Sequence, residues 1–244
     1  MGYDLTLFEK GLEELSISLS QEQKRQFVTY YEYLIEKNKV MNLTAITEYE
    51  EVIVKHFLDS LSIVKAGCFE QNALDGKSVI DIGTGAGFPG IPLKIAFPQL
   101  KITLLDSLNK RVNFLNEVIE MLGLSKVEAV HGRAEDYAKQ KEYRECFDFC
   151  VSRAVANLST LSEYCIPFVK EGGCFISYKS GKIDEELSQA GNAVKILGGK
   201  VLDVVKFPLM GTDMDRSFVI IKKTRPTAKK YPRKAGLPSK EPLA

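Results

Sequence analysis

A glycine-rich turn between two apolar segments holds the residues of this chain that are best suited to binding a nucleotide. The turn reads Asp81-Ile82-Gly83-Thr84-Gly85-Ala86-Gly87, so every second residue from Gly83 lacks a side chain. Glycines let a backbone approach a ligand closely, because no Cβ blocks the way. Asp81 comes directly before the glycines, and a second acid, Asp106, ends the next apolar segment. This spacing predicts a nucleotide-type cofactor held by the turn and a carboxylate.

Two classes of cofactor compete for this turn. Residues 85–90, GAGFPG, satisfy the dinucleotide spacing G-x-G-x-x-G, and Asp106 follows at a distance suited to a ribose hydroxyl. S-adenosylmethionine shares the adenosine but has no pyrophosphate. A carboxylate at Asp81 attracts the cationic amino and sulfonium groups of that cofactor and repels a pyrophosphate. The sequence therefore favours S-adenosylmethionine over a dinucleotide.

The turn requires a strand before it and a helix after it, and the sequence supplies both. Residues 78–82 form a short apolar run, Pro89 and Pro92 suit a first helical turn, and residues 101–105 form a second strand. Further strands are expected at 127–130, 147–151, 174–178, 201–205 and 217–221, with helices at 109–122, 158–169 and 183–197. This alternation predicts an α/β fold with a mostly parallel sheet covered on both faces, whose seventh strand pairs antiparallel with the sixth.

Two flanking segments depart from this alternation. Residues 1–65 are expected to be helical, with a capping-box spacing between Ser20 and Gln23, and no linker rich in glycine or proline follows them. We therefore expect an N-terminal helical cap packed on a core formed by residues 66–223. The tail, residues 224–244, is basic and proline-rich and lacks the apolar content for a core of its own. It is either a solvated end or an arm that becomes ordered on RNA phosphates, and the second interpretation is favoured.

The overall composition limits the class of protein. The chain has 244 residues, of which 45% are hydrophobic and 27% charged, as in soluble globular domains. No apolar run approaches the roughly 20 residues that cross a bilayer, and the N-terminus lacks the order of a signal peptide. Five cysteines without a C-x-x-C pair and two distant histidines predict no metal site. We expect a cytoplasmic protein that binds neither a metal nor a membrane.

Basic residues stand at the ends of three predicted parallel strands. Arg133 follows the third strand, Arg153 follows the fourth and Lys179 follows the fifth. Each could instead pair with a neighbouring acid at the surface, where an ion pair contributes little. The carboxyl ends of parallel strands form the edge at which α/β folds bind ligands. The shared position of three basic residues at this edge therefore favours a functional role over three independent surface ion pairs.

Over essentially its full length, the sequence resembles the bacterial small-subunit rRNA guanine-N7 methyltransferases, the RsmG (GidB) family. The resemblance implies a Rossmann-like, seven-stranded methyltransferase fold, S-adenosylmethionine as the cofactor, and N7 of a guanine in 16S rRNA as the methyl acceptor. The small ribosomal subunit is the implied partner, and we expect a monomer. The matching residues are Asn42-Leu43-Thr44, His56-Phe57-Leu58-Asp59-Ser60, residues 81–92 (DIGTGAGFPGIP), Leu105-Asp106-Ser107 with Lys110-Arg111, and Ser152-Arg153-Ala154.

The resemblance also implies roles by position. The glycines would face the methionine part of the cofactor, Asp106 the ribose hydroxyls, and Ala134 with Glu135 the adenine. The full cofactor-binding set is Asp81, Gly83, Thr84, Gly85, Gly87, Phe88, Asp106, Arg133, Ala134, Glu135 and Arg153, and the catalytic set is Asn42, Arg153, Lys179 and Arg216.

Guanine N7 carries an in-plane lone pair, so no proton has to leave before it attacks a methyl group. Such a reaction needs no general base and depends on the alignment of N7, methyl carbon and sulfur. We expect Arg153 or Lys179 to bind guanine O6 and a phosphate, and the rate to be constant between about pH 6.5 and 8.5. Three alternatives stay open: a methyltransferase with another acceptor on nucleic acid or protein, a cofactor-binding module without turnover, and a Rossmann oxidoreductase.

Overall fold

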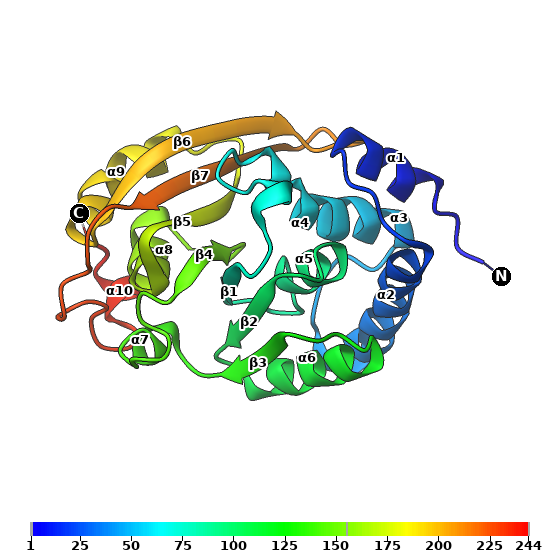
Figure 1. Cartoon of the computed structure of the whole chain (residues 1–244), viewed down its shortest axis with the longest axis horizontal. Coiled ribbons are helices and arrows are strands. Elements are labelled where there is room, and N and C mark those ends of the chain that lie inside the picture. Colours follow the sequence, from blue (N-terminus) through cyan, green and yellow to red (C-terminus); the bar gives the residue numbers. More distant parts are fainter. Residues whose placement is uncertain (1, 155, 244) are drawn as a thin grey trace.

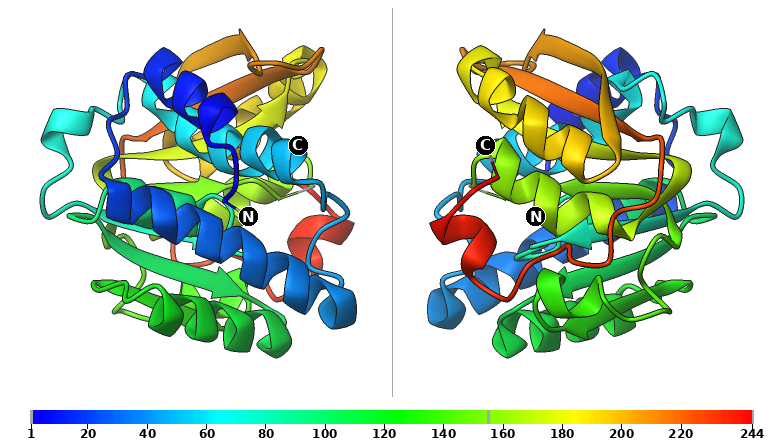
Figure 2. Two further views of the ribbon diagram at one scale, coloured as in Figure 1. Left: turned by 90° about the vertical axis from the view of Figure 1, so that its right-hand side faces the viewer. Right: turned by 90° about the vertical axis from the view of Figure 1, so that its left-hand side faces the viewer.

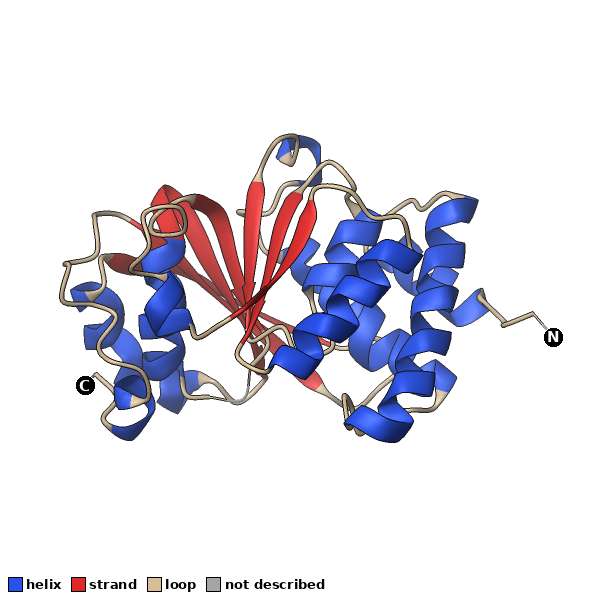
Figure 3. Ribbon diagram, turned by 90° about the horizontal axis from the view of Figure 1, so that it is seen from below, coloured by secondary structure: helices blue, strands red, loops and turns tan. Residues whose placement is uncertain are grey.

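A seven-stranded sheet runs through the middle of the molecule, with helices on both of its faces (Figures 1 and 3). The computed structural model describes residues 2–154 and 156–243. The strand order is β3-β2-β1-β4-β5-β7-β6, which confirms the predicted Rossmann-like α/β fold. The strands are β1 (Ser78–Ile82), β2 (Lys101–Asp106), β3 (Val127–His131), β4 (Phe147–Ser152), β5 (Val169–Ser180), β6 (Gly199–Pro208) and β7 (Asp215–Lys223).

Strand β7 is the exception in a sheet whose first five strands pair in parallel. It runs antiparallel to β6, as predicted, and it also lies between β6 and β5. Because β7 runs in the opposite direction, its first residues lie beside the last residues of β5, with Arg216 opposite Ser180. A side chain at the start of β7 thereby joins the edge formed by the carboxyl ends of the parallel strands.

The helices divide between the two faces of the sheet (Figures 2 and 3). Helices α1 to α6 cover one face, and α7 to α10 cover the other. Residues Ile53–Leu58, between α3 and α4, wind as a π-helix, and Ser62–Lys65 follow as a 3-10 turn. The helices are α1 (Thr6–Glu14), α2 (Gln21–Met41), α3 (Tyr49–Val52), α4 (Asp59–Leu61), α5 (Gly90–Ala96), α6 (Asn109–Met121), α7 (Ala134–Tyr137), α8 (Leu158–Cys165), α9 (Asp184–Ile196) and α10 (Leu237–Lys240).

Alternate residues of the strands face two separate apolar cores, as the period of two in a β-strand requires. Along β7, Phe218 and Ile220 pack in the core beneath α1 to α6, whereas Val219 and Ile221 pack in the core beneath α8 and α9. The N-terminal helices contribute Phe8 and others to the first of these cores. They therefore pack on the sheet directly, while the division of the chain at residues 65 and 223 stays a prediction.

Strand β5 is longer than the strand expected at 174–178, because it also includes Gly172 and Gly173. Strand β5 begins at Val169 and continues through both glycines. Gly172 has a φ of +82°, and a Cβ on Gly173 would lie 2.5 Å from the carbonyl oxygen of Asp148. The pairing register of β4 and β5 shifts at the same place. The glycines therefore allow a bulge and a close approach of two strands, which a turn signal in the sequence does not distinguish.

The C-terminal segment, residues 224–243, is folded onto the body of the protein. Thr227 and Tyr231 are buried in it, and Tyr231 belongs to the core beneath α8 and α9. Lys223, at the end of β7, is buried and forms an ion pair with Glu145 at 2.9 Å. The segment is thus neither a solvated end nor an arm that waits for RNA. It has too little apolar surface for its own core, but enough to complete one that the sheet provides.

Within the residues that the structure describes, no helix is both long and apolar enough to span a bilayer. Among the same residues, no group of three His, Cys, Asp or Glu side chains is placed to hold a metal ion. All five cysteines are free thiols.

The close packing of α5 against β2 gives a prediction for stability. A Cβ on Gly90 would lie 2.1 Å from Cδ2 of Leu104 and 3.0 Å from Oδ2 of Asp81. The substitution Gly90→Ala should therefore lower the free energy of unfolding by about 1–3 kcal/mol, as measured by chemical denaturation. Gly191→Ala in α9 is the control, since its Cβ would meet no atom within 4 Å. That change should raise stability by up to about 1 kcal/mol through helix propensity; equal effects would contradict the packing argument.

Candidate functional site

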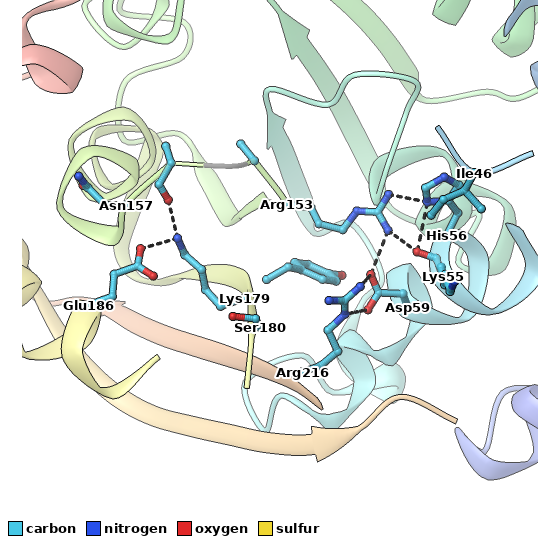
Figure 4. Close-up of a pocket in the computed structure, with 13 residues that line it drawn as sticks. Ile46, Lys55, His56, Asp59, Arg153, Asn157, Lys179, Ser180, Glu186 and Arg216 are labelled. Atoms are coloured by element: carbon cyan, nitrogen blue, oxygen red, sulfur yellow. Dashed lines mark hydrogen bonds and ion pairs between the residues drawn. The ribbon is translucent and has the colours of Figure 1, made fainter. Parts of the chain in front are cut away.

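Two adjoining cavities open at the edge formed by the carboxyl ends of the parallel strands. The smaller has a volume of about 230 Å³ and is lined mainly by the segments that follow β1, β2 and β3. The larger has a volume of about 700 Å³ and lies between the end of β4, the end of β5, the start of β7 and the helical segment 49–61 (Figure 4). Ala154 and Ala156 line both cavities. The two cavities therefore meet at the loop after β4.

The structure brings together three of the four residues in the predicted catalytic set. Arg153, Lys179 and Arg216 all line the larger cavity. Asn42 does not line either cavity: it is exposed, has a φ of +51° and ends α2. Its predicted catalytic role stays a prediction.

A buried carboxylate, Asp59, connects the two arginines of the larger cavity (Figure 4). Its Oδ2 accepts from Arg153 at 3.0 Å, and its Oδ1 accepts from Nε of Arg216 at 2.8 Å. Asp59 is 1% exposed. A carboxylate so completely removed from water requires paired donors, because an unpaired buried charge is very costly. The two guanidinium groups supply these donors, and Asp59 in turn fixes their positions.

His56, one helical turn before Asp59, holds Arg153 from the other side. Nδ1 of His56 lies 3.1 Å from a terminal nitrogen of Arg153, and Nε2 lies 2.8 Å from Oγ1 of Thr44. Nδ1 also lies 3.1 Å from the carbonyl oxygen of Lys55, so it has both a donor, the guanidinium of Arg153, and an acceptor beside it. Burial and the neighbouring Arg153 lower the pKa of His56 to about 3. The imidazole is therefore neutral at physiological pH and has both nitrogens engaged.

The loop that follows α2 fixes this histidine. The side chain of Asn38 accepts from the backbone N–H groups of Leu43 and Thr44 at 2.6 and 2.9 Å. It also donates to the carbonyl of Thr44 at 2.9 Å. The Asn42-Leu43-Thr44 motif thus acts through Thr44, whose hydroxyl contacts His56. A chain of hydrogen bonds therefore connects the end of α2 to Arg153.

Lys179 is held on the opposite side of the larger cavity. Its Nζ lies 2.6 Å from Glu186, at the start of α9, and 2.5 Å from the carbonyl oxygen of Ala156 (Figure 4). The lysine thereby joins β5 to the loop after β4, which is the boundary between the two cavities. Its charge is balanced by Glu186.

Asp81 is completely buried at the end of β1. Its Oδ2 accepts from the hydroxyl of Thr84 at 2.7 Å and from the N–H of Gly90 at 2.9 Å. Its Oδ1 has no hydrogen-bond partner within the described part of the chain. Burial raises the pKa of Asp81 to about 7, although these two hydrogen bonds oppose the shift. Asp81 lines neither cavity, and its predicted contact with a cationic ligand group stays a prediction.

The glycines of the turn serve two different purposes. Gly83 and Gly85 have φ angles of +70° and +63°, and a Cβ on either would have no atom closer than 3.6 Å. These two glycines leave open space, and Gly83 lines the smaller cavity. A Cβ on Gly87, by contrast, would lie 2.6 Å from Ile91 and 2.8 Å from the hydroxyl of Tyr30. Gly87 therefore permits packing against α2, and its predicted contact with the cofactor stays a prediction.

Phe88 also lies outside the linings of both cavities. Its ring stacks on His56 with 4.4 Å between ring centres, and the guanidinium of Arg153 lies 5.0 Å from its ring centre. The geometry makes Phe88 a support for these two residues, and the predicted cofactor contact remains untested.

The remaining predicted cofactor residues surround the smaller cavity or support it. Arg133, Ala134 and Glu135 line it. Asp106 is 3% exposed and accepts from the N–H of Gly85 at 2.9 Å and of Leu108 at 2.9 Å. It thereby ties the glycine turn to the end of β2, and its predicted contact with a ribose stays a prediction.

Sequence reasoning did not single out Asp59 or His56 as site residues. One signal was present, since a histidine and an acid three residues apart lie on the same side of a helix. Because residues 52–61 are mostly apolar, His56 and Asp59 in this segment indicate buried polar partners for both side chains. The identity of these partners, on β4 and β7, required the structure.

Comparison with known proteins agrees with this geometry. Residues 23–215 match the family GidB, described as rRNA small subunit methyltransferase G. The chain is 55% identical over 240 residues to "Ribosomal RNA small subunit methyltransferase G" of Lachnoclostridium phytofermentans, with 98% of each chain covered. It is 50% identical over 237 residues to the protein of that name in Alkaliphilus metalliredigens, covering 97% of this chain and 98% of the relative.

A solved structure, M. jannaschii TYW2 in complex with AdoMet, matches with a TM-score of 0.51 at 14% identity. The match covers 68% of this chain and 76% of that one, and it supports the fold alone. The sequence matches, in contrast, extend over nearly the whole chain at high identity. The chain therefore belongs to the rRNA small subunit methyltransferase G family.

Proposed function

We propose that this protein transfers a methyl group from S-adenosylmethionine to N7 of a guanine in 16S rRNA, in the cytoplasm, by in-line attack without a general base. The observation that carries the proposal is the larger cavity, which is strongly basic yet has no free base among its described residues. Its carboxylates, Asp59 and Glu186, are both ion-paired, and His56 is neutral with both nitrogens engaged. Such a cavity suits an acceptor atom that already has a lone pair.

The turn after β1 fits the cofactor. The unpaired oxygen of Asp81 would accept from the cationic amino group of the methionine part, and the open space at Gly83 and Gly85 admits the ligand backbone. Ala134 and Glu135 would then lie beside the adenine in the smaller cavity. The cofactor supplies an electrophilic methyl group next to the larger cavity. The side chains of this chain supply orientation and charge.

Atoms and electrons balance without a proton acceptor. The lone pair of guanine N7 forms the new bond to the methyl carbon, and the carbon–sulfur bond breaks with its electron pair moving to sulfur. The positive charge passes from sulfur to the methylated base. Alignment of nitrogen, carbon and sulfur is the main requirement, and orientation of this kind contributes several kcal/mol.

The structure supports a different assignment of basic residues from the one favoured by the sequence. The guanidinium of Arg153 donates to Asp59, His56 and the carbonyl of Lys55, and Lys179 is engaged by Glu186 and Ala156. Arg216 contacts Asp59 through Nε and one terminal nitrogen. Its other terminal nitrogen has no partner within the described residues. Arg216 is therefore the better candidate to bind guanine O6 or a phosphate, with Arg153 as a positioning residue.

Locating the methyl group on the product tests this proposal. Purified protein is incubated with labelled S-adenosylmethionine and either small ribosomal subunits lacking the modification or protein-free 16S rRNA, and the digested nucleosides are identified by mass spectrometry. We expect N7-methylguanosine in at least one of the two reactions. Label on another atom, or on ribosomal protein, would show that guanine N7 is not the acceptor.

Removal of Arg153 should separate catalysis from cofactor binding. Arg153→Ala leaves Asp59 with one partner and His56 without its donor, so the cavity loses the arrangement that orients the base. We expect the rate of methyl transfer to fall by roughly 100-fold or more, with less than about a fivefold change in the Kd for S-adenosylmethionine measured by calorimetry. The exposed Lys206→Ala, on β6, is the control and should change neither quantity. Equal losses of rate and affinity would contradict the assignment.

The raised pKa of Asp81 gives a pH dependence to cofactor binding. Below pH 7 the carboxyl of the free protein is protonated and must lose its proton before it can accept from a cationic group. The logarithm of the association constant should therefore rise by up to about one per pH unit below that pKa and level off above it. The pH-independent rate expected from the sequence then applies to kcat at saturating cofactor. The value of kcat/KM for the cofactor instead rises with pH as the carboxyl of Asp81 ionises.

Calorimetry in buffers of different ionisation enthalpy measures the affinity and the protons released. Asp81→Asn is the control, because it has no carboxyl to titrate. It should bind weakly and show no such rise. An identical pH profile of affinity for the wild type and Asp81→Asn would show that Asp81 does not contact the cofactor.

A further inference from the structure

The C-terminal segment lies against α7 and α8 (Figures 1 and 2). Residues of both helices line the smaller cavity. Helix α10 contacts α8, and the hydroxyl of Thr160 in α8 donates to the carbonyl of Pro238 at 3.0 Å. Four lysines of the segment, Lys229, Lys230, Lys234 and Lys240, are exposed. Thr227, Tyr231 and Arg233 are instead directed toward the body of the protein.

An ion pair with a buried carboxylate anchors the segment to α8. Arg233 donates to both carboxylate oxygens of Glu163, with a shortest side-chain distance of 2.7 Å, and its backbone N–H donates to the same residue at 2.7 Å. Glu163 is 1% exposed. Bidentate pairs between arginine and carboxylate have fixed geometry, so this contact sets the position of the chain that follows it.

Arg144 anchors the preceding part of the segment. One of its terminal nitrogens donates to the carbonyls of Ala138 and Tyr231, both at 2.9 Å. The other donates to the carbonyl of Thr227 at 2.7 Å. Ala138 ends the short helix α7, so Arg144 binds α7 and the C-terminal segment together.

The anchored segment directs one backbone donor at the smaller cavity. The N–H of Gly236 lies 2.8 Å from Oε1 of Glu135, which is 4% exposed and lines that cavity. Oε2 of Glu135 accepts no hydrogen bond from the described residues. Gly236 has a φ of +80°, a conformation that other residues rarely adopt. The turn at Gly236 therefore satisfies one oxygen of a nearly buried carboxylate and leaves the second for a ligand.

We propose that the C-terminal segment is a strut that positions Glu135 for the adenosine part of the cofactor, with Arg233 and Gly236 as positioning residues. This inference rests on the proposed placement of the cofactor in the smaller cavity. Glu135 belongs to α7, a single turn of four residues that cannot fix a side chain by itself. The segment supplies the missing constraint through Arg144, Tyr231 and Gly236. A ligand amino or hydroxyl group then meets a carboxylate that is already oriented.

A double-mutant cycle on the full chain, without RNA, tests the strut. Gly236→Val introduces a β-branched residue at a positive φ, which forces the turn to change, although a Cβ there would meet no atom within 4 Å. Gly172→Val is the matched control, because Gly172 has a φ of +82° and equally open surroundings at the other end of the sheet. Glu135→Gln and the double variant Glu135→Gln with Gly236→Val complete the set. The Kd for S-adenosylmethionine is measured by calorimetry, and KM and kcat by methyl transfer.

If the strut acts through Glu135, Gly236→Val raises the Kd and the KM for the cofactor by roughly tenfold or more and leaves kcat unchanged at saturation. In the Glu135→Gln background, Gly236→Val has little further effect on the Kd, since substitutions at coupled residues do not have additive effects. Gly172→Val leaves the Kd unchanged. Arg233→Ala, which releases the anchor without changing Gly236, raises the Kd in the same direction.

Three outcomes would overturn the inference. Additive losses from Glu135→Gln and Gly236→Val would mean that the segment acts on affinity by another route. A wild-type Kd for Gly236→Val and Arg233→Ala, with a weakened Glu135→Gln, would reject the strut and leave the proposed cofactor site intact. A wild-type Kd for Glu135→Gln in a protein that binds S-adenosylmethionine would reject the placement of the adenosine, and the strut with it.

Discussion

The geometry of the larger cavity depends on one buried carboxylate. Asp59 joins three parts of the chain, since its partners Arg153 and Arg216 are 94 and 157 residues away in sequence. Removal of one partner from a buried ion pair commonly costs about 3–5 kcal/mol, because the remaining charge is left uncompensated. The apolar contacts of the N-terminal helices hold them on the sheet but do not fix the direction of any polar group. Asp59 does so, and through Arg153 it also fixes His56 and the loop that ends α2.

The glycine turn shows how one short motif can serve packing and binding together. Gly83 leaves space at the smaller cavity, whereas Gly87 and Gly90 leave space for neighbouring side chains of the protein itself. Asp81, directly before the turn, is hydrogen-bonded to Thr84 and Gly90. Its position is thus determined before any ligand arrives, which reduces the entropy cost of binding.

Local patterns predicted the parts of this structure that local interactions determine. Short segments predicted the strands, the antiparallel pairing of β6 and β7, the capping box at Ser20 and the convergence of basic residues at one edge.

The partners of Asp59 could not be predicted, because they depend on contacts across most of the chain. The packing of the C-terminal segment was also missed, since its composition does not reveal that Tyr231 and Arg233 face inward while the lysines face outward. The start of β5 was placed too late, because glycines such as Gly172 and Gly173 occur in turns as well as in bulges within strands.

The insertion of β7 between β5 and β6 has a consequence for synthesis on the ribosome. Strand β6 emerges before the strand that joins it to the sheet, so its inner edge has no partner until residues 215–223 follow. Arg216 arrives with that last strand. A nascent chain can therefore assemble the glycine turn early, whereas the larger cavity is complete only after β7 has emerged, and Glu135 of the smaller cavity meets Gly236 later still.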